Sequence, residues 1–150
     1  MRIYLDCCCF NRPFDDQSQS RIRDEADAIL SILARYAQSG HTILGSAVLR
    51  LELSRIPDAD KRIKAHMLYA AASHEVPASE QVLLKAEKIQ RTANIRKMDA
   101  LHLASAEAGR ADIFLTTDMS LLRNCGKLRL ALRAMNPVSH LAEIIENDEY

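Results

Sequence analysis

The stretch "RKMDALHLASAEAGRADIFLTTD", residues 96–118, combines the two patterns that decide the fold class. Its first part, up to Gly109, is apolar or small almost all round when wound as a helix, which is typical of a helix packed against a sheet. Its second part, "ADIFLTTD", is the clearest buried strand in the chain. A buried helix followed at once by a buried strand is the repeating unit of an α/β domain.

The rest of the chain continues this alternation. Further strands are expected at 2–6, 41–46 and 130–137, with a brief extended segment at 74–78. Helices are expected at 19–38, 47–56, 58–73, 80–93, 119–124 and 138–147, and residues 11–20 are expected to form a loop. Short, continuously apolar strands between helices favour a parallel sheet that is covered on both faces. The prediction is one three-layer α/β/α domain with a central parallel sheet, spanning residues 1–150.

The composition is that of an ordinary globular protein. Of the 150 residues, 48% are hydrophobic, and 20 Lys and Arg balance 20 Asp and Glu. This balance gives no overall field that would attract nucleic acid or a membrane, but local patches matter more than the sum. Basic residues cluster at 50–64 and 85–97, where solvated helix faces are the simpler interpretation. No segment has the pattern of a signal peptide or a membrane span, so we expect a cytoplasmic protein without membrane contact.

Three of the four cysteines follow the first strand directly. Cys7, Cys8 and Cys9 are adjacent, and the fourth is Cys125. On an extended chain, three adjacent side chains point to alternate faces, so they neither pair nor form a C-x-x-C metal knuckle. Free thiols in a reducing compartment are the better interpretation. A zinc site that joins Cys7 or Cys9 to Cys125 and a histidine is the alternative.

Four acidic residues are predicted to meet at one edge of the sheet. Asp6 and Asp118 each end a strand, and the carboxyl ends of parallel strands share the edge at which such sheets form their sites. Glu52 lies in the second turn of the helix after the second strand, so it can project toward that edge. Asp99 lies near the start of its own helix and can do the same.

Each of these residues also has a simpler structural interpretation. Asp6 would serve a turn, and Asp118 would cap the next helix. Glu52 would pair with Arg55 or Arg50. Asp99 would be a first-turn partner of its helix dipole, held by Arg96 or Lys97. His102 is either a metal ligand or a hydrogen-bonded core histidine, and the core role is the simpler one.

Together, the four acids predict metal chemistry. Clustered carboxylates repel and raise one another's pKa unless a cation lies among them. Oxygen ligands without a convincing set of His or Cys ligands suit a hard cation, Mg²⁺ or Mn²⁺. Such an ion lowers the pKa of a water and stabilises a phosphodiester under in-line attack. Thr116 and Thr117 add hydroxyls that can bind a water or a phosphate oxygen.

Four segments also carry a family resemblance: "IYLDCCCFNRPFDD", "LRLELSR", "KMDALHLASA" and "FLTTD". In this order they resemble the four acidic motifs of PIN-domain proteins, and the closing "MNPVSHL" is similar to the end of many bacterial PIN proteins. The resemblance covers nearly the whole chain. It implies a metal-dependent endoribonuclease that cleaves RNA, most often the toxin of a VapBC-type (type II) toxin–antitoxin pair. It also implies a cognate antitoxin as partner and, usually, a homodimer.

The roles of the family map onto this chain by position. Asp6, Glu52 and Asp99 correspond to the core metal-binding acids, and Asp118 to the more variable fourth acid. Thr117 resembles the hydroxyl residue that often precedes the fourth acid.

The chain departs from the family pattern after its first acid. The family commonly has Thr or Ser followed by Asn or Ser, whereas this chain has Cys7 and Cys8. A thiol is a poorer partner than a hydroxyl for a metal-bound water or a phosphate, so a different activity or metal preference is expected. Asn11 and Arg12 are candidates to compensate from the loop above the site, with ordinary loop structure as the alternative.

Other classes of function remain as alternatives. The first is a catalytically weak or inactive PIN-fold module that binds RNA or a protein partner without cutting. A signalling receiver domain is disfavoured because the last strand ends in "MNP" without a Lys, and because Asp15 and Asp16 lie well down a loop. A small phosphatase with a nucleophilic Asp is disfavoured because no D-x-D follows "IYL".

Overall fold

A five-stranded, entirely parallel sheet forms the centre of the computed structural model, which describes residues 1–148. Its strands are β1 (Arg2–Leu5), β2 (Thr42–Ser46), β3 (His74–Val76), β4 (Ile113–Leu115) and β5 (Arg133–Met135). They lie in the order β3-β2-β1-β4-β5. The chain therefore moves outward from β1 to β3 and then returns to the other side of β1. Ligand sites of open parallel sheets form beside such a reversal, which here lies between β1 and β4.

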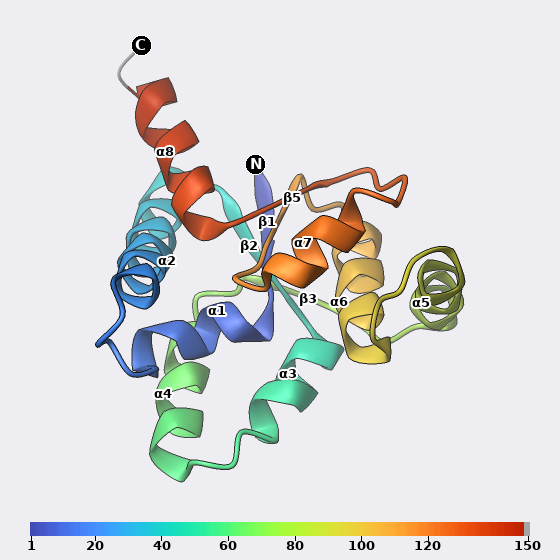
Figure 1. The fold of residues 1–150 in the computed structure, drawn as a ribbon, viewed down its shortest axis with the longest axis horizontal. Helices are drawn as coiled ribbons and strands as arrows, with labels where there is room; N and C mark the ends of the chain where they lie inside the picture. The colour runs from blue at the N-terminus through green and yellow to red at the C-terminus, as the bar shows by residue number, and fades with distance from the viewer. Residues whose placement is uncertain (149–150) are drawn as a thin grey trace.

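Helices cover both faces of this sheet, so the predicted three-layer architecture is confirmed (Figure 1). On one side, α2 (Ser20–Ser39) packs against α8 (Pro137–Asp148), and α1 (Cys7–Asn11) packs against α4 (Ala59–Tyr69). On the other side, α5 (Glu80–Thr92) packs against α6 (Lys97–Ala108). The short α3 (Ala47–Ser54) contacts both α4 and α6, and α7 (Met119–Cys125) leads toward β5. Among the described helices, none is both long enough and apolar enough to cross a membrane.

The strands are buried because helices cover both of their faces, which is why they are apolar without alternation. Ile3, Leu5 and Phe114 are fully buried, and the rings of Tyr4 and Phe114 stack with their centroids 5.6 Å apart. Local signals fix several element ends as expected. Gly40 ends α2 with a left-handed φ of 75°, and Ser46 caps α3 by accepting a hydrogen bond from the Leu49 amide.

The cysteine segment differs from its predicted conformation. Residues 7–9 were expected to be extended, but Cys7–Asn11 form helix α1, and Arg12–Phe14 form a 3-10 helix, η1, where a loop was expected. The reason lies in Asp6, whose carboxylate accepts a hydrogen bond of 2.7 Å from the amide of Cys7 and thereby caps the helix. The strands predicted at 111–118 and 130–137 are also shorter, because each forms a ladder over only three residues.

Gly45 in β2 gives a stability test of the packing between the sheet and α4. A Cβ at this position would lie 2.3 Å from the hydroxyl oxygen of Tyr69, which donates a hydrogen bond to Glu75. We expect Gly45→Ala to lower the free energy of unfolding by about 1–2 kcal/mol, because overpacking moves a buried ring. Urea unfolding measures the change. Gly126→Ala is the control, since its Cβ would meet nothing closer than 3.3 Å, and equal losses in both variants would contradict this packing.

Candidate metal centre

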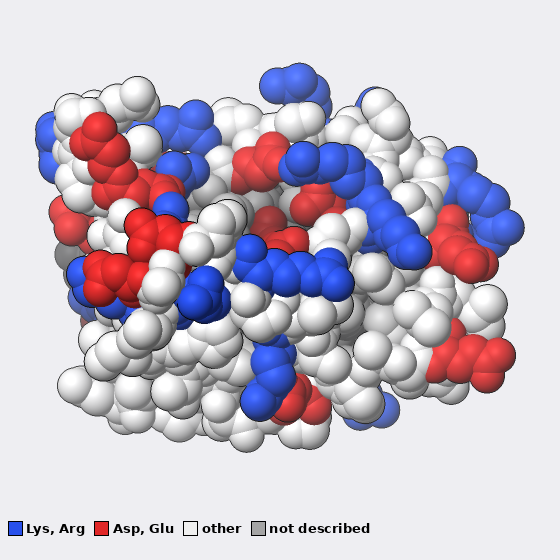
Figure 2. Space-filling model, turned by 90° about the horizontal axis from the view of Figure 1, so that it is seen from below, with Lys and Arg blue, Asp and Glu red and all other residues white. Residues whose placement is uncertain are grey.

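The four predicted acids line one pocket of about 250 Å³ beside the ends of β1 and β4. Asp6 directly follows β1, Glu52 lies on α3, Asp99 on α6, and Asp118 directly precedes α7. Figure 2 views the molecule from the side toward which β1 runs and shows acidic side chains in a hollow with basic side chains along its border. The structure thus brings together four residues that are far apart in the sequence.

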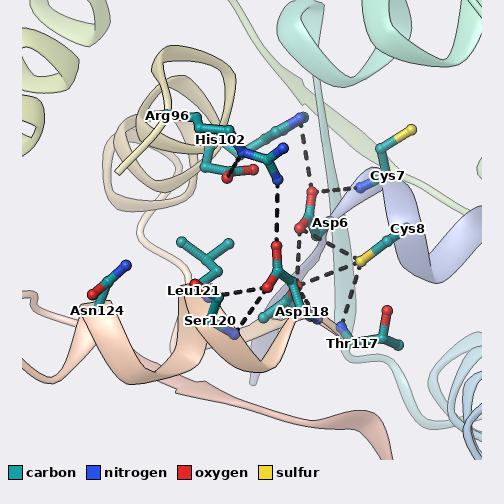
Figure 3. A network of polar contacts seen from close by, with 12 residues as sticks. Asp6, Cys7, Cys8, Arg96, His102, Thr117, Asp118, Ser120, Leu121 and Asn124 are labelled. Atoms are coloured by element: carbon teal, nitrogen blue, oxygen red, sulfur yellow. Dashed lines mark hydrogen bonds and ion pairs between the residues drawn. The ribbon is translucent and has the colours of Figure 1, made fainter. Parts of the chain in front are cut away.

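Asp6 is the most firmly held of the four. Its side chain is 7% exposed, and one carboxylate oxygen accepts the capping hydrogen bond from Cys7. The other oxygen accepts hydrogen bonds from the Thr116 hydroxyl at 2.9 Å and from the Cys8 thiol at 3.5 Å (Figure 3). These contacts fix the carboxylate within the pocket.

A buried chain of hydrogen bonds positions Glu52. His102 is fully buried, and its Nε2 donates to Glu52 at 3.2 Å, while its Nδ1 lies 2.7 Å from the hydroxyl of Tyr4. Tyr4 also lies 2.7 Å from the hydroxyl of Ser46. The simpler interpretation of His102, a hydrogen-bonded core histidine, therefore describes its contacts. Through Nε2 the imidazole also reaches within 3.8 Å of Asp6, so it lies beside two of the four acids.

The pKa values of the residues in this hydrogen-bond network reflect competition between burial and charge. Burial by itself raises the pKa of Glu52, but the hydrogen bond and charge of His102 outweigh it, so the pKa is lowered. Burial by itself lowers the pKa of His102, but the hydrogen bond to Glu52 and the charge of Asp6 raise it overall. Burial also raises the pKa of Tyr4, so its hydroxyl stays protonated and can donate to one of its two neighbours.

Arg96 bridges the other two acids. Its Nε lies 3.3 Å from Asp99 and its terminal nitrogen lies 3.4 Å from Asp118, while its side chain remains 80% exposed (Figure 3). Asp118 also caps α7, because its other oxygen accepts hydrogen bonds from the amides of Ser120 and Leu121. The capping interpretation of Asp118 therefore describes one of its oxygens, and the second oxygen faces the guanidinium. From the sequence, Arg96 was expected only as a local partner of Asp99. Its contact with Asp118 spans 22 residues and could not be predicted from local sequence.

Asp99 is a partly buried carboxyl group with another carboxylate nearby, and its pKa reflects both conditions. The pKa is raised, first by burial and then by the charge of Asp6, even though Arg96 acts to lower it. A cation between these carboxylates would relieve both effects.

Thr117 and Asn11, which were expected to support the acids, make their side-chain hydrogen bonds elsewhere. The hydroxyl of Thr117 accepts a hydrogen bond of 2.9 Å from Arg12, and it is the neighbouring Thr116 that contacts Asp6. Asn11 is not among the residues that line the acidic pocket, and its amide nitrogen donates to the sulfur of Cys7 at 3.8 Å.

Of the adjacent cysteines, Cys8 is the one that lines the pocket. Its sulfur lies 3.4 Å from the Thr116 hydroxyl and accepts a hydrogen bond from the Thr117 amide at 3.4 Å. The sequence interpretation did not distinguish Cys8 from Cys7, because the helical turn that separates them was not expected. The thiol occupies a place beside Asp6 where a hydroxyl would be a stronger hydrogen-bond partner.

The donor set fits a hard or borderline divalent cation. Within residues 1–148, one group of His, Cys, Asp and Glu side chains has its ligand atoms within 4.8 Å of one another, namely Asp6, Glu52 and His102. The zinc site postulated from Cys7 or Cys9 with Cys125 and a histidine is therefore not formed by the described residues. Carboxylate oxygens suit Mg²⁺ or Mn²⁺, and the remaining two acids of the pocket supply further oxygens, whereas Nε2 of His102 donates its hydrogen bond to Glu52.

Comparisons with known proteins agree with this architecture. The family model described as the PIN domain matches residues 3–127. Among solved structures, one similar chain belongs to the crystal structure of VapBC2 from Rickettsia felis bound to a DNA fragment from their promoter. The two chains are 15% identical, with 91% of this chain and 98% of that chain covered and a TM-score of 0.63, so the likeness concerns the fold. No curated protein matches the chain.

Proposed function

The chain belongs to the PIN-domain family, and from that premise we propose that it is a metal-dependent endoribonuclease that hydrolyses RNA phosphodiester bonds. One observation carries the proposal: four carboxylates from four separate elements line one pocket at the reversal of strand order. Such an arrangement costs repulsion in the absence of a cation, and the charge of Asp6 adds to burial in raising the pKa of Asp99. The acids that would hold the ion are Asp6, Glu52 and Asp99, with Asp118 at the border of the pocket.

When bound, Mg²⁺ or Mn²⁺ supplies an activated water and stabilises charge on a phosphate under attack. The chain's own residues prepare the site for this chemistry. Thr116 and the Cys7 amide hold Asp6 in one orientation, and His102 holds Glu52. Arg96 is exposed, so its guanidinium can exchange its carboxylate partners for a phosphate oxygen of the substrate.

We also propose that the enzyme is the toxin of a type II toxin–antitoxin pair, acts in the cytoplasm and forms a homodimer. Its support is the resemblance of the acidic motifs together with the likeness to a chain of the Rickettsia felis VapBC2 structure. A cognate antitoxin would then be its protein partner. Co-expression of this chain with the product of the neighbouring reading frame, followed by co-purification and a growth assay, tests this part separately.

A second candidate function is a PIN-fold module that binds RNA without cutting it. The observation that favours it is Cys8, whose thiol stands beside Asp6 in a place where the family commonly has a hydroxyl or amide. An intact set of four acids favours the nuclease.

A cleavage assay with controlled metal separates the two functions. Purified protein is incubated with a mixed pool of RNA and with Mn²⁺, Mg²⁺ or EDTA. We expect cleavage with either metal and none with EDTA, with faster cleavage in Mn²⁺ because an imidazole and a thiol border the carboxylates. RNA that is cut equally in EDTA would contradict the metal centre. RNA that is bound but uncut in every condition would support the non-cutting module.

A further inference from the structure

A basic pocket of about 290 Å³ lies between α5 and residues 127–130, the segment that follows α7. Four cationic side chains and one hydroxyl line it around an apolar floor: Lys85, Lys88, Thr92, Lys127 and Arg129. No acidic side chain lines this pocket. A group of converging cations is an electrostatic site for an anion.

Most of these cations have no acidic partner. Lys85 pairs with Glu107 at 3.4 Å. Among residues 1–148, Lys88, Lys127 and Arg129 form no ion pair. All three are exposed, so an anion can reach them from solvent. Three unpaired cations that face one hollow are therefore available to a ligand.

A third pocket of about 400 Å³ adjoins the metal centre. It shares Arg96, Asp99 and Asp118 with the acidic pocket. It is also lined by Asn94 and Asn124, which lie within three positions in the sequence of Thr92 and Lys127 of the basic pocket. The amide nitrogen of Asn124 donates to the carbonyl of Asn94 at 3.0 Å, so the α5–α6 connection and α7 are held side by side.

We infer that the three pockets together form a seam along the α5–α6 connection and α7, and that this seam is the track on which single-stranded RNA lies. Phosphates of the RNA contact Lys88, Lys127 and Arg129, while the phosphate to be cut reaches the acids. The inference rests on the proposed function, because it names how the substrate of that same site is held. A chain with regularly spaced phosphates can occupy several pockets in turn, which a single small anion cannot.

The lining of the seam also predicts how the RNA is recognised. Its polar side chains between the acids and the cations, Asn94, Ser120 and Asn124, can exchange hydrogen bonds with bases and 2′-hydroxyls. No aromatic side chain lines any of the three pockets, so base stacking contributes little. Binding should therefore depend mainly on phosphates, tolerate many sequences and weaken strongly with salt.

The test measures RNA binding by the full chain with Asp6→Asn, so that the RNA stays intact. The probe is a fluorescein-labelled single-stranded RNA of 20 nucleotides and mixed sequence, followed by fluorescence anisotropy from 50 to 300 mM salt. Adding Lys127→Gln and Arg129→Gln is expected to weaken binding about tenfold at 100 mM salt. It should also make the slope of log affinity against log salt shallower by about 1.4, since each lost phosphate contact contributes about 0.7 on a single strand.

The matched control adds Lys64→Gln and Arg110→Gln, which also remove one Lys and one Arg charge from exposed positions outside the seam. We expect the control pair to keep the parent's affinity and slope. Lys88→Gln alone should weaken RNA binding by a smaller factor. This single variant keeps the test valid if the double variant does not fold. Equal affinity and slope in the seam variant and the control would overturn the inference.

The outcomes also separate this inference from the proposed function. If wild-type protein cuts RNA but the seam variant binds like the control, the track is wrong and the nuclease stands. If wild-type protein cuts nothing but the seam variant binds RNA more weakly than the control, the nuclease is wrong and the track stands. A parent protein that binds no RNA at 50 mM salt overturns the track.

Discussion

Asp6→Asn is expected to lower metal-dependent RNA cleavage at least about 10³-fold, which corresponds to about 4 kcal/mol of lost transition-state stabilisation. Asp6 is the most buried of the four acids and is oriented by hydrogen bonds from Cys7, Cys8 and Thr116. The substitution removes one negative charge from the position at which the other carboxylates converge, without changing the size of the side chain. Initial rates on one RNA substrate, in Mn²⁺ and at equal protein concentration, measure the loss.

The fold of the Asp6→Asn protein should remain intact. An asparagine keeps an oxygen that can cap α1, and it relieves the repulsion that acts on Asp99. Its melting temperature in EDTA should therefore stay close to that of the wild type. Asp27→Asn, an exposed carboxylate of α2, is the matched control and should cut normally. A fall in melting temperature that accounts for the lost activity would instead make Asp6 a structural acid.

Arg12→Met is expected to lower the free energy of unfolding by about 3 kcal/mol, because it leaves a buried carboxylate short of its counter-charge. That carboxylate belongs to Glu25, whose side chain is 2% exposed and lies 3.3 Å from Nε of Arg12. Arg12 also donates to the hydroxyl of Thr117 and pairs with Asp15, so it ties η1 to both α2 and the end of β4. Methionine preserves most of the apolar stem, so the loss reports on the charge. Urea unfolding at low salt measures it.

Arg21→Met serves as the matched control for this prediction. Arg21 approaches the same Glu25 carboxylate at 3.5 Å, but its side chain is 56% exposed. Exposed pairs are worth about 0–1 kcal/mol, so Arg21→Met should cost far less than Arg12→Met. The hydrogen bond of 2.6 Å from Asn136 to Glu25 remains in both variants. Equal losses would show that burial of the pair does not set its energy.

The sheet could be predicted from the sequence because its strands are continuous apolar runs that alternate with helices. Helix α1 could not, because the conformation of residues 7–9 depends on whether Asp6 ends a strand or caps a helix, and both roles are ordinary for Asp. The carboxylate of Asp6 caps the helix, while its backbone amide still donates a hydrogen bond to the carbonyl of Leu115 in β4. The short ladders of β4 and β5 depend on their partners, which local sequence does not specify.

The convergence of the four acids could be predicted because topology places the ends of parallel strands, where Asp6 and Asp118 lie, at one edge, and because Glu52 and Asp99 lie in the first two turns of their helices. The contacts that orient them could not, since they join residues far apart in the chain. The bond between Tyr4 and His102 spans 98 residues, and the contact between Arg96 and Asp118 spans 22. A buried tyrosine in a strand and a buried histidine in a helix were the signals for the first of these contacts. Their pairing depends on tertiary packing.

Binding of Mn²⁺ to the purified protein tests most directly the claim that the acids form a metal centre. Electron paramagnetic resonance counts the bound ions in the wild-type, Asp6→Asn and Asp27→Asn proteins across a titration. The wild-type and Asp27→Asn proteins are expected to bind Mn²⁺ alike, and Asp6→Asn to bind at least about tenfold more weakly, as loss of a ligand or its support typically causes. Equal Mn²⁺ binding by all three proteins, or no binding by the wild type, would contradict the metal centre.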